Sequence, residues 1–216
     1  MSLLRSSLEM AVSTPEAARV TLGSAATIAL GGIASWAIRG REKANYEATH
    51  DGLTGLLNAQ GFEAVLEKNG PPQAVIYIDA TNLKGANDKL GHSAGDRGIV
   101  GVANTIKTIL RKDDFAARIG GDEFVVLLNK ARRNENKDIK EPPTSQELLE
   151  TVTDRMEAGI TGFLSENPDL YEAGFNVAVG GVVSQEGMTT KDMKEMAEQK
   201  MYQAKEQQHA AIGAYR

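Results

Sequence analysis

Three carboxylates stand where the sequence predicts the ends of β-strands. Asp79 follows the apolar run 75–78, and Asp122 and Glu123 follow two glycines in the segment "ARIGGDEFVVLL", residues 117–128. Each carboxylate alone fits a turn or a cap. If the two strands are neighbours in one sheet, the three side chains converge and repel one another unless cations balance them. Oxygen-only ligands favour Mg²⁺ or Mn²⁺, and two such ions serve in-line displacement at phosphorus.

Groups suited to a nucleotide accompany these carboxylates. Gly120 and Gly121 lack a Cβ, so their backbone can approach a phosphate closely. Residues 90–96 read as a short, turn-rich loop before a helix, with Asn87 and Asp96 on its flanks. An Asn carbonyl and an Asp carboxylate can together accept hydrogen bonds from a guanine edge, whereas adenine offers no such donor pair. A turn role for Asn87 and an N-cap role for Asp96 are the alternatives.

Helices and short strands are predicted to position these groups. Apolar spacing predicts a helix around residues 62–66, and the strand that ends near Asp79 has the continuous apolar run of a buried strand. The paired glycines predict a hairpin with positive φ. Ser145 is predicted to cap a helix that runs to about Leu164. Further patterns predict a helix after residue 96, an exposed loop at 131–146, a strand at 175–184 and a last helix at 189–211.

Size and composition describe an ordinary globular chain. Its 216 residues suffice for one full domain and an appendage. Apolar residues make up 41% and charged residues 25%, and the net charge of −5 argues against a broad surface for a nucleic-acid polymer. The chain has no cysteine, which excludes a disulfide framework and thiolate metal sites and fits a cytosolic catalytic domain.

The N-terminal segment, residues 1–40, has a different character. Residues 20–38 carry no charge, and a helix of this length spans about 28 Å, close to the hydrocarbon thickness of a bilayer. Basic residues beginning at Arg39 favour a cytoplasmic C-terminal side, so the prediction is an inner-membrane anchor. A surface or interaction helix is the alternative, and a cleaved signal peptide fits less well because Glu9 and Glu16 precede the apolar run.

A helical linker is predicted at residues 41–50, followed by one domain at residues 51–210. No sensory domain is recognisable in the roughly 50 residues before it, which are fewer than such a domain needs. Small residues within 23–32 could let two N-terminal helices approach closely, so this segment is predicted to set location and pairing.

Four collinear motifs give this chain its resemblance to a known family. They are "DGLTGLLN" at 51–58, "IDATNLKGANDKLGHSAGD" at 78–96, "RKDDFAARIGGDEF" at 111–124 and "AEQKMYQAK" at 197–205. Together they resemble the GGDEF domain of the diguanylate cyclases, over about residues 51–209. The resemblance implies an α+β fold of the nucleotidyl-cyclase, palm-like type, with a mostly antiparallel sheet flanked by helices and preceded by an N-terminal helix.

The activity that the resemblance implies joins two GTP into cyclic di-GMP and releases two pyrophosphates. Each domain of the family holds one GTP, so the resemblance implies a homodimer with the reaction at its interface and a divalent metal, Mg²⁺ or Mn²⁺, as cofactor. Such chemistry depends on positioning and charge neutralisation rather than on a nucleophilic side chain.

Site residues follow from the matched motifs. The resemblance implies that Asp122 is a metal ligand and the general base toward the attacking 3′-hydroxyl, and that Glu123 completes the catalytic metal site. The other metal ligands that the resemblance implies are the Asp79 side chain and the backbone carbonyl of Ala80. The implied substrate-binding residues are Leu83, Lys84, Asn87, His92, Asp96, Gly121 and Lys205, with Asn87 and Asp96 on guanine and Lys205 on the terminal phosphates.

A second site is implied five residues before the glycines. Arg111 and Asp114 match the family's RxxD pattern for inhibition by the product, and an Arg side chain can bind a guanine edge or a phosphate bidentately. A solvated charge run at a helix end is the alternative reading of these two residues.

Several positions depart from the family pattern. Thr81 replaces a second Asp and Leu83 a Phe, which leaves the main metal and guanine groups intact. Ala59 and Gln60 replace an Arg pair, and His209 replaces an Arg, so the grip on phosphate is weakened. A degenerate domain that binds GTP or cyclic di-GMP without turnover is therefore the alternative function. A changed base preference is a third hypothesis, which the retained Asp96 disfavours.

Overall fold

The computed structural model describes residues 39–130 and 143–214. The chain divides into two compact units, one ending at Glu47 and the other beginning at Ala48. Backbone at 39–49 is helical, overlapping the predicted linker. The predicted membrane segment, 20–38, and most of the predicted loop at 131–146 lie outside the described residues. Within the described ranges, no helix combines the length and the apolar character that crossing a bilayer requires.

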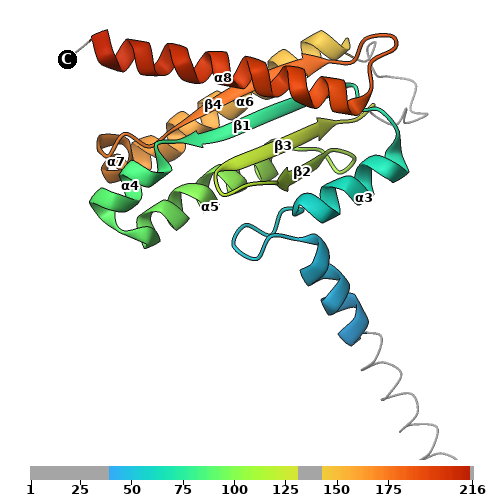
Figure 1. Cartoon of the computed structure of the whole chain (residues 1–216), viewed down its shortest axis with the longest axis horizontal. Coiled ribbons are helices and arrows are strands. Elements are labelled where there is room, and N and C mark those ends of the chain that lie inside the picture. The colour runs from blue at the N-terminus through green and yellow to red at the C-terminus, as the bar shows by residue number, and fades with distance from the viewer. Residues whose placement is uncertain (1–38, 131–142, 215–216) are drawn as a thin grey trace, which may run out of the picture. The chain divides into compact units, whose positions relative to one another are not determined.

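A four-stranded sheet forms the centre of the second unit (Figure 1). Its strands are β1 (Ala74–Thr81), β2 (Phe115–Arg118), β3 (Glu123–Leu128) and β4 (Asn176–Val183). They lie in the order β2-β3-β1-β4, and each strand is antiparallel to its neighbour. The predicted α+β fold with an antiparallel sheet is confirmed.

Helices cover both faces of this sheet (Figure 1). Side chains of α5 and α6 pack on one face, and side chains of α3 and α8 pack on the other. The helices of the second unit are α3 (Ala59–Asn69), α4 (Leu83–Leu90), α5 (His92–Ile109), α6 (Ser145–Glu166), α7 (Pro168–Glu172) and α8 (Thr190–Ala214).

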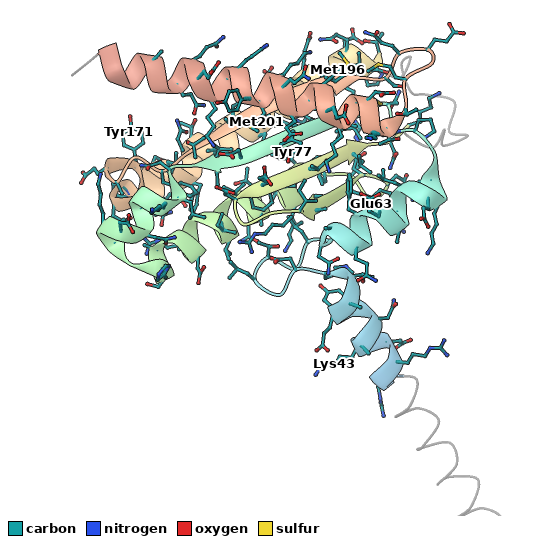
Figure 2. All side chains as sticks on the ribbon, in the orientation of Figure 1. Lys43, Glu63, Tyr77, Tyr171, Met196 and Met201 are labelled. Atoms are coloured by element: carbon teal, nitrogen blue, oxygen red, sulfur yellow. The ribbon has the colours of Figure 1, made fainter. Side chains whose placement is uncertain are left out.

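Two hydrophobic cores result from this layering and explain the apolar run in β1. Successive side chains of a strand point to opposite faces, so Ile76 and Ile78 pack toward α5 and α6 while Val75 and Tyr77 pack toward α8. Figure 2 shows Tyr77 and Met201, which belong to the core beneath α8. Every residue of β1 is buried because both faces are covered.

Close contact between α8 and β4 positions the last helix. A Cβ on Gly180 would overlap the Met201 nitrogen and the Ala197 oxygen, so α8 rests on the backbone of β4. Met193, Ala197 and Met201 are buried against the sheet, and Lys205 is the next residue in the same four-residue spacing. This spacing directs Lys205 toward the sheet as well.

Three predictions of local structure were wrong. Residues 90–96 are helical apart from Gly91, whose φ of 87° separates α4 from α5, so Asp96 lies inside α5 rather than at a loop. Gly120 and Gly121 do not have the positive φ predicted for a primed hairpin turn. Thr144, not Ser145, caps α6, because its side chain forms a capping box with Glu147.

Candidate active site

The strand register places two of the predicted metal ligands, Asp79 and Glu123, opposite each other. Asp79 of β1 and Glu123 of β3 are direct cross-strand partners, and the Ala80 N–H donates to the Asp122 carbonyl over 2.8 Å. Side chains directly opposite in an antiparallel pair share a face of the sheet. Asp79 and Glu123 therefore lie together on the face that α8 covers.

Lys205 pairs with Asp79 in this arrangement. Its Nζ lies 2.9 Å from Oδ1 and 3.0 Å from Oδ2 of Asp79, although the two residues are 126 positions apart. The Asp79 side chain is only 8% exposed, so its charge needs a cationic partner. Across residues 39–130 and 143–214, no group of three or more His, Asp or Glu side chains is gathered to hold a metal ion.

Negative charge nevertheless collects around this pair. Burial raises the pKa of the Tyr77 phenol well above its usual value, and the nearby carboxylates of Glu123, Glu198 and Asp79 raise it further. Glu198 was not predicted from the sequence. Glu198 lies seven residues before Lys205, which is two helical turns away on the same side of α8. This spacing could have predicted that both side chains lie near the carboxylates.

An unpaired acceptor marks the junction of α4 and α5. The Asn87 Oδ1 is buried and has no hydrogen-bond partner within the part of the chain that the structure describes. A Cβ on Gly95 would overlap this oxygen, so the glycine leaves it room. Leu83 is half-buried beside them. The predicted guanine acceptor is thus built into the structure without a protein donor.

Polar contacts hold α4 against α7. Asn82 begins α4 with a φ of 57°, a left-handed conformation that Asn tolerates better than most residues. Its Nδ2 donates to the Ala173 carbonyl over 3.1 Å, and Lys89 Nζ donates to the same oxygen over 3.2 Å. Arg97 of α5 forms an ion pair with Asp169 of α7. Neither α7 nor the positioning role of Asn82 was predicted from the sequence.

Arg118 connects the hairpin to the first motif. Its Nη1 lies 3.1 Å from Asp51 Oδ1, while its Nε and Nη2 donate to the Gly121 carbonyl over 3.1 Å and 2.6 Å. Asp51 also accepts from the Thr54 N–H and hydroxyl. Burial of Asp51 raises its pKa, but the hydrogen bonds from Thr54 and Arg118 outweigh burial and leave the pKa lowered. Arg118 was not predicted, since only the fold brings residues 51 and 118 together.

Comparison with known proteins decides the family. The family model for the diguanylate cyclase GGDEF domain matches residues 48–211, most of the chain. The chain belongs to the GGDEF domain family. The predicted family is confirmed.

Individual relatives agree with this assignment. Over 90 residues, 38% of this chain, the GGDEF domain is 43% identical to the diguanylate cyclase TpbB of Pseudomonas aeruginosa. The match spans only 21% of the length of TpbB. The solved GGDEF domain of TpbB aligns at a TM-score of 0.55 with 30% identity, covering 73% of this chain and 89% of that one. The GGDEF domain of DgcB from Caulobacter crescentus, solved in complex with c-di-GMP, aligns at 0.56 with 27% identity, covering 74% and 91%.

The donor set of this GGDEF domain fits a hard divalent cation. Asp79 and Glu123 face each other across the sheet and Asp122 is adjacent in sequence, so only oxygen ligands are available. The Lys205 ammonium contacts both oxygens of Asp79 and balances its charge.

The other predicted substrate residues of the GGDEF domain are mostly accessible. Lys84, His92, Asp96 and Gly121 are exposed, and no contact of their side chains tests their predicted roles. The side chain of His209, which departs from the family pattern, lies outside the described residues.

The predicted inhibitory residues lie in a turn with its own hydrogen bonds. Asp114 Oδ2 accepts from the Arg111 N–H and Oδ1 accepts from the Asn129 N–H, both over 3.0 Å. Arg111 is exposed, and it lines a cavity of about 440 Å³ together with Lys107 and Lys112. The turn thus combines a structural carboxylate with two exposed cations, Arg111 and Lys112.

Proposed function

We propose that this GGDEF domain condenses two GTP into cyclic di-GMP and releases two pyrophosphates, with Mg²⁺ or Mn²⁺ as cofactor. The observation that supports this proposal most directly is the cross-strand pairing of Asp79 with Glu123, next to Asp122 at the hairpin. The pairing gathers oxygen ligands where the backbone of Gly121 is exposed and open to a phosphate.

Each residue has a defined role in this reaction. The 3′-hydroxyl oxygen of one GTP bonds to the α-phosphorus of the other, the bond to pyrophosphate breaks, and Asp122 takes the hydroxyl proton. Asn87 Oδ1 and the exposed Asp96 carboxylate accept from the guanine edge, and Lys205 binds the terminal phosphates. Asp79, Asp122 and Glu123, with the Ala80 carbonyl, would hold a divalent cation, which would neutralise charge on the triphosphate.

The reaction requires two copies of the domain, each presenting one GTP. We assign pairing and membrane association, with the catalytic domain on the cytoplasmic side, to the segment before the linker. Deleting residues 1–40 should lower dimerisation or membrane association. An unchanged oligomeric state together with unchanged fractionation would contradict that role.

Incubation of the purified full chain with GTP and Mg²⁺ tests the cyclase proposal, with the product identified by mass. Glu123→Gln should lower the rate roughly 100- to 1000-fold, the usual cost of losing one electrostatic contact to the transition state. Glu195→Gln removes an equal charge at an exposed position of α8 and should keep the wild-type rate. Absence of cyclic dinucleotide from a demonstrably dimeric sample would contradict the proposal.

A second candidate is a module that binds GTP or cyclic di-GMP without turnover and signals through a partner. The motivation is the weakened phosphate grip: Ala59 and Gln60 stand where the family has an Arg pair, and Lys205 is engaged by Asp79. Titration calorimetry that shows tight binding without any product would favour this candidate, whereas measurable turnover would exclude it.

Product inhibition at Arg111 and Asp114 is the regulatory part of the proposal. Arg111 and Lys112 are exposed cations that line the same, otherwise mostly apolar cavity, and such side chains can bind the phosphates of a dinucleotide. Arg111→Ala should weaken inhibition by added cyclic di-GMP while the initial rate stays near wild type. Equal inhibition of both proteins would contradict this assignment.

A further inference from the structure

Lys205 occupies the place on Asp79 that a metal ion would take. The ammonium contacts both carboxylate oxygens, at 2.9 Å and 3.0 Å, as a chelated cation does. The pair is well shielded, since the side chains of Asp79 and Lys205 are 8% and 28% exposed. Because the ammonium contacts both oxygens, a metal ion that takes Asp79 as a ligand must compete with Lys205 for this carboxylate.

The packing of α8 supports the ammonium in this position. Gly180 lets the helix rest on β4, and the buried row Met193, Ala197 and Met201 leads to Lys205 above the sheet. Lys200, on the same helix, instead donates to the Gly181 carbonyl over 3.0 Å and makes no contact with the carboxylates. The contact with Asp79 is therefore specific to one lysine of α8.

We propose that Lys205 is a resident cation that blocks metal binding at Asp79 until a triphosphate draws it away. The inference rests on the proposed function, in which Lys205 binds the terminal phosphates. A bare divalent ion must displace the ammonium, whereas a triphosphate offers the ammonium a second anion. Metal and nucleotide thus each strengthen the binding of the other, because a coupling between two ligands is reciprocal.

Direct binding of Mn²⁺ to the full chain, followed by the electron paramagnetic resonance of free Mn²⁺, tests the inference. Without nucleotide, Lys205→Met should bind Mn²⁺ roughly tenfold more tightly than wild type, a typical size for such coupling. A non-hydrolysable GTP analogue should tighten Mn²⁺ binding in wild type and much less in Lys205→Met. Lys200→Met is the matched control and should behave as wild type in both measurements.

Lys205→Arg keeps a cation on Asp79 and should retain the weak Mn²⁺ binding of wild type, which separates loss of charge from a change in folding. Equal or weaker Mn²⁺ binding by Lys205→Met, with Lys200→Met unchanged, would overturn the inference. If wild type makes cyclic di-GMP but Lys205→Met shows no gain, the inference fails and the cyclase proposal stands. If Mn²⁺ binding tightens but wild type makes no product, the cyclase proposal fails and the inference stands.

Discussion

The Arg111–Asp114 turn and the α4–α5 junction both contain polar side chains that the sequence marks as ligand-binding. In the turn, both oxygens of Asp114 accept backbone N–H groups, from Arg111 and Asn129. At the junction, Asn87 Oδ1 is buried and lacks a donor among the described residues. A buried acceptor without a donor costs about 1–3 kcal/mol, whereas a satisfied acceptor stabilises the fold.

Asp79 represents an intermediate case between these regions. Its carboxylate is satisfied, but by a flexible lysine side chain rather than by backbone donors. An ammonium on a long stem can move to another anion without unfolding the chain. Asp114 therefore has the partners that are hardest to replace with a ligand. Asp79 has a partner that can move away, and Asn87 Oδ1 has no partner to displace.

Removal of the Asp114 carboxylate should have the largest effect on stability. Asp114→Ala leaves two backbone donors without their charged acceptor, and hydrogen bonds to charged groups contribute about 1.5–3 kcal/mol each. We expect the free energy of unfolding in urea to fall by about 3 kcal/mol. Lys112→Ala, an exposed neighbour, is the control. A loss below about 1 kcal/mol would show that the carboxylate is free for a ligand.

Truncation of Asn87 should weaken GTP binding without lowering stability, the reverse of what is expected for Asp114. Asn87→Ala removes an acceptor that has no protein donor, so the free energy of unfolding should not fall. GTP binding, measured by calorimetry, should weaken by about 1–3 kcal/mol because a base contact is lost. The control is Asn104→Ala, at an exposed position of α5. Unchanged GTP affinity would mean that Asn87 Oδ1 accepts no hydrogen bond from guanine.

A smaller effect is expected from filling the space beside Asn87. In Gly95→Ala the new Cβ would overlap Asn87 Oδ1 and lie 3.0 Å from the Leu83 side chain, which displaces the acceptor. GTP affinity should fall several-fold although residue 95 makes no nucleotide contact. Gly162→Ala, in open space on α6, should keep GTP affinity and gain up to about 1 kcal/mol from helix propensity. Identical binding by both variants would refute the steric role of Gly95.

The smallest effect concerns Asp51, another acceptor whose donors are protein groups. Its pKa is lowered in the folded protein, so its stabilisation is complete above the ordinary value of 3.8 and is lost as the pH falls through the folded pKa. The difference in melting temperature between wild type and Asp51→Asn should therefore be largest near pH 6 and shrink below about pH 4. Asp154→Asn is the exposed control. A difference that does not change with pH would contradict the lowered pKa.

Much of this protein follows from local sequence. The apolar run 75–78 predicted a buried strand, and the segment around Gly120 and Gly121 predicted two strands joined by a tight connection. The boundary at residues 90–96 was wrong because one glycine with positive φ can separate two helices without a loop. The few residues around such a glycine do not show whether a second helix begins directly after it or whether a loop follows.

The sequence by itself determined the helix and strand patterns and which side chains carry charge near the hairpin, because residue type and periodicity are local properties. Its four collinear motifs carried the resemblance that implied the family and the antiparallel sheet. Only the tertiary structure decided which charges meet. Lys205 reaches Asp79 across 126 positions and Arg118 reaches Asp51 across 67. These pairs depend on how closely α8 packs on β4 at Gly180 and on where the hairpin ends. Such distances arise from three-dimensional packing, which no sequence pattern encodes locally.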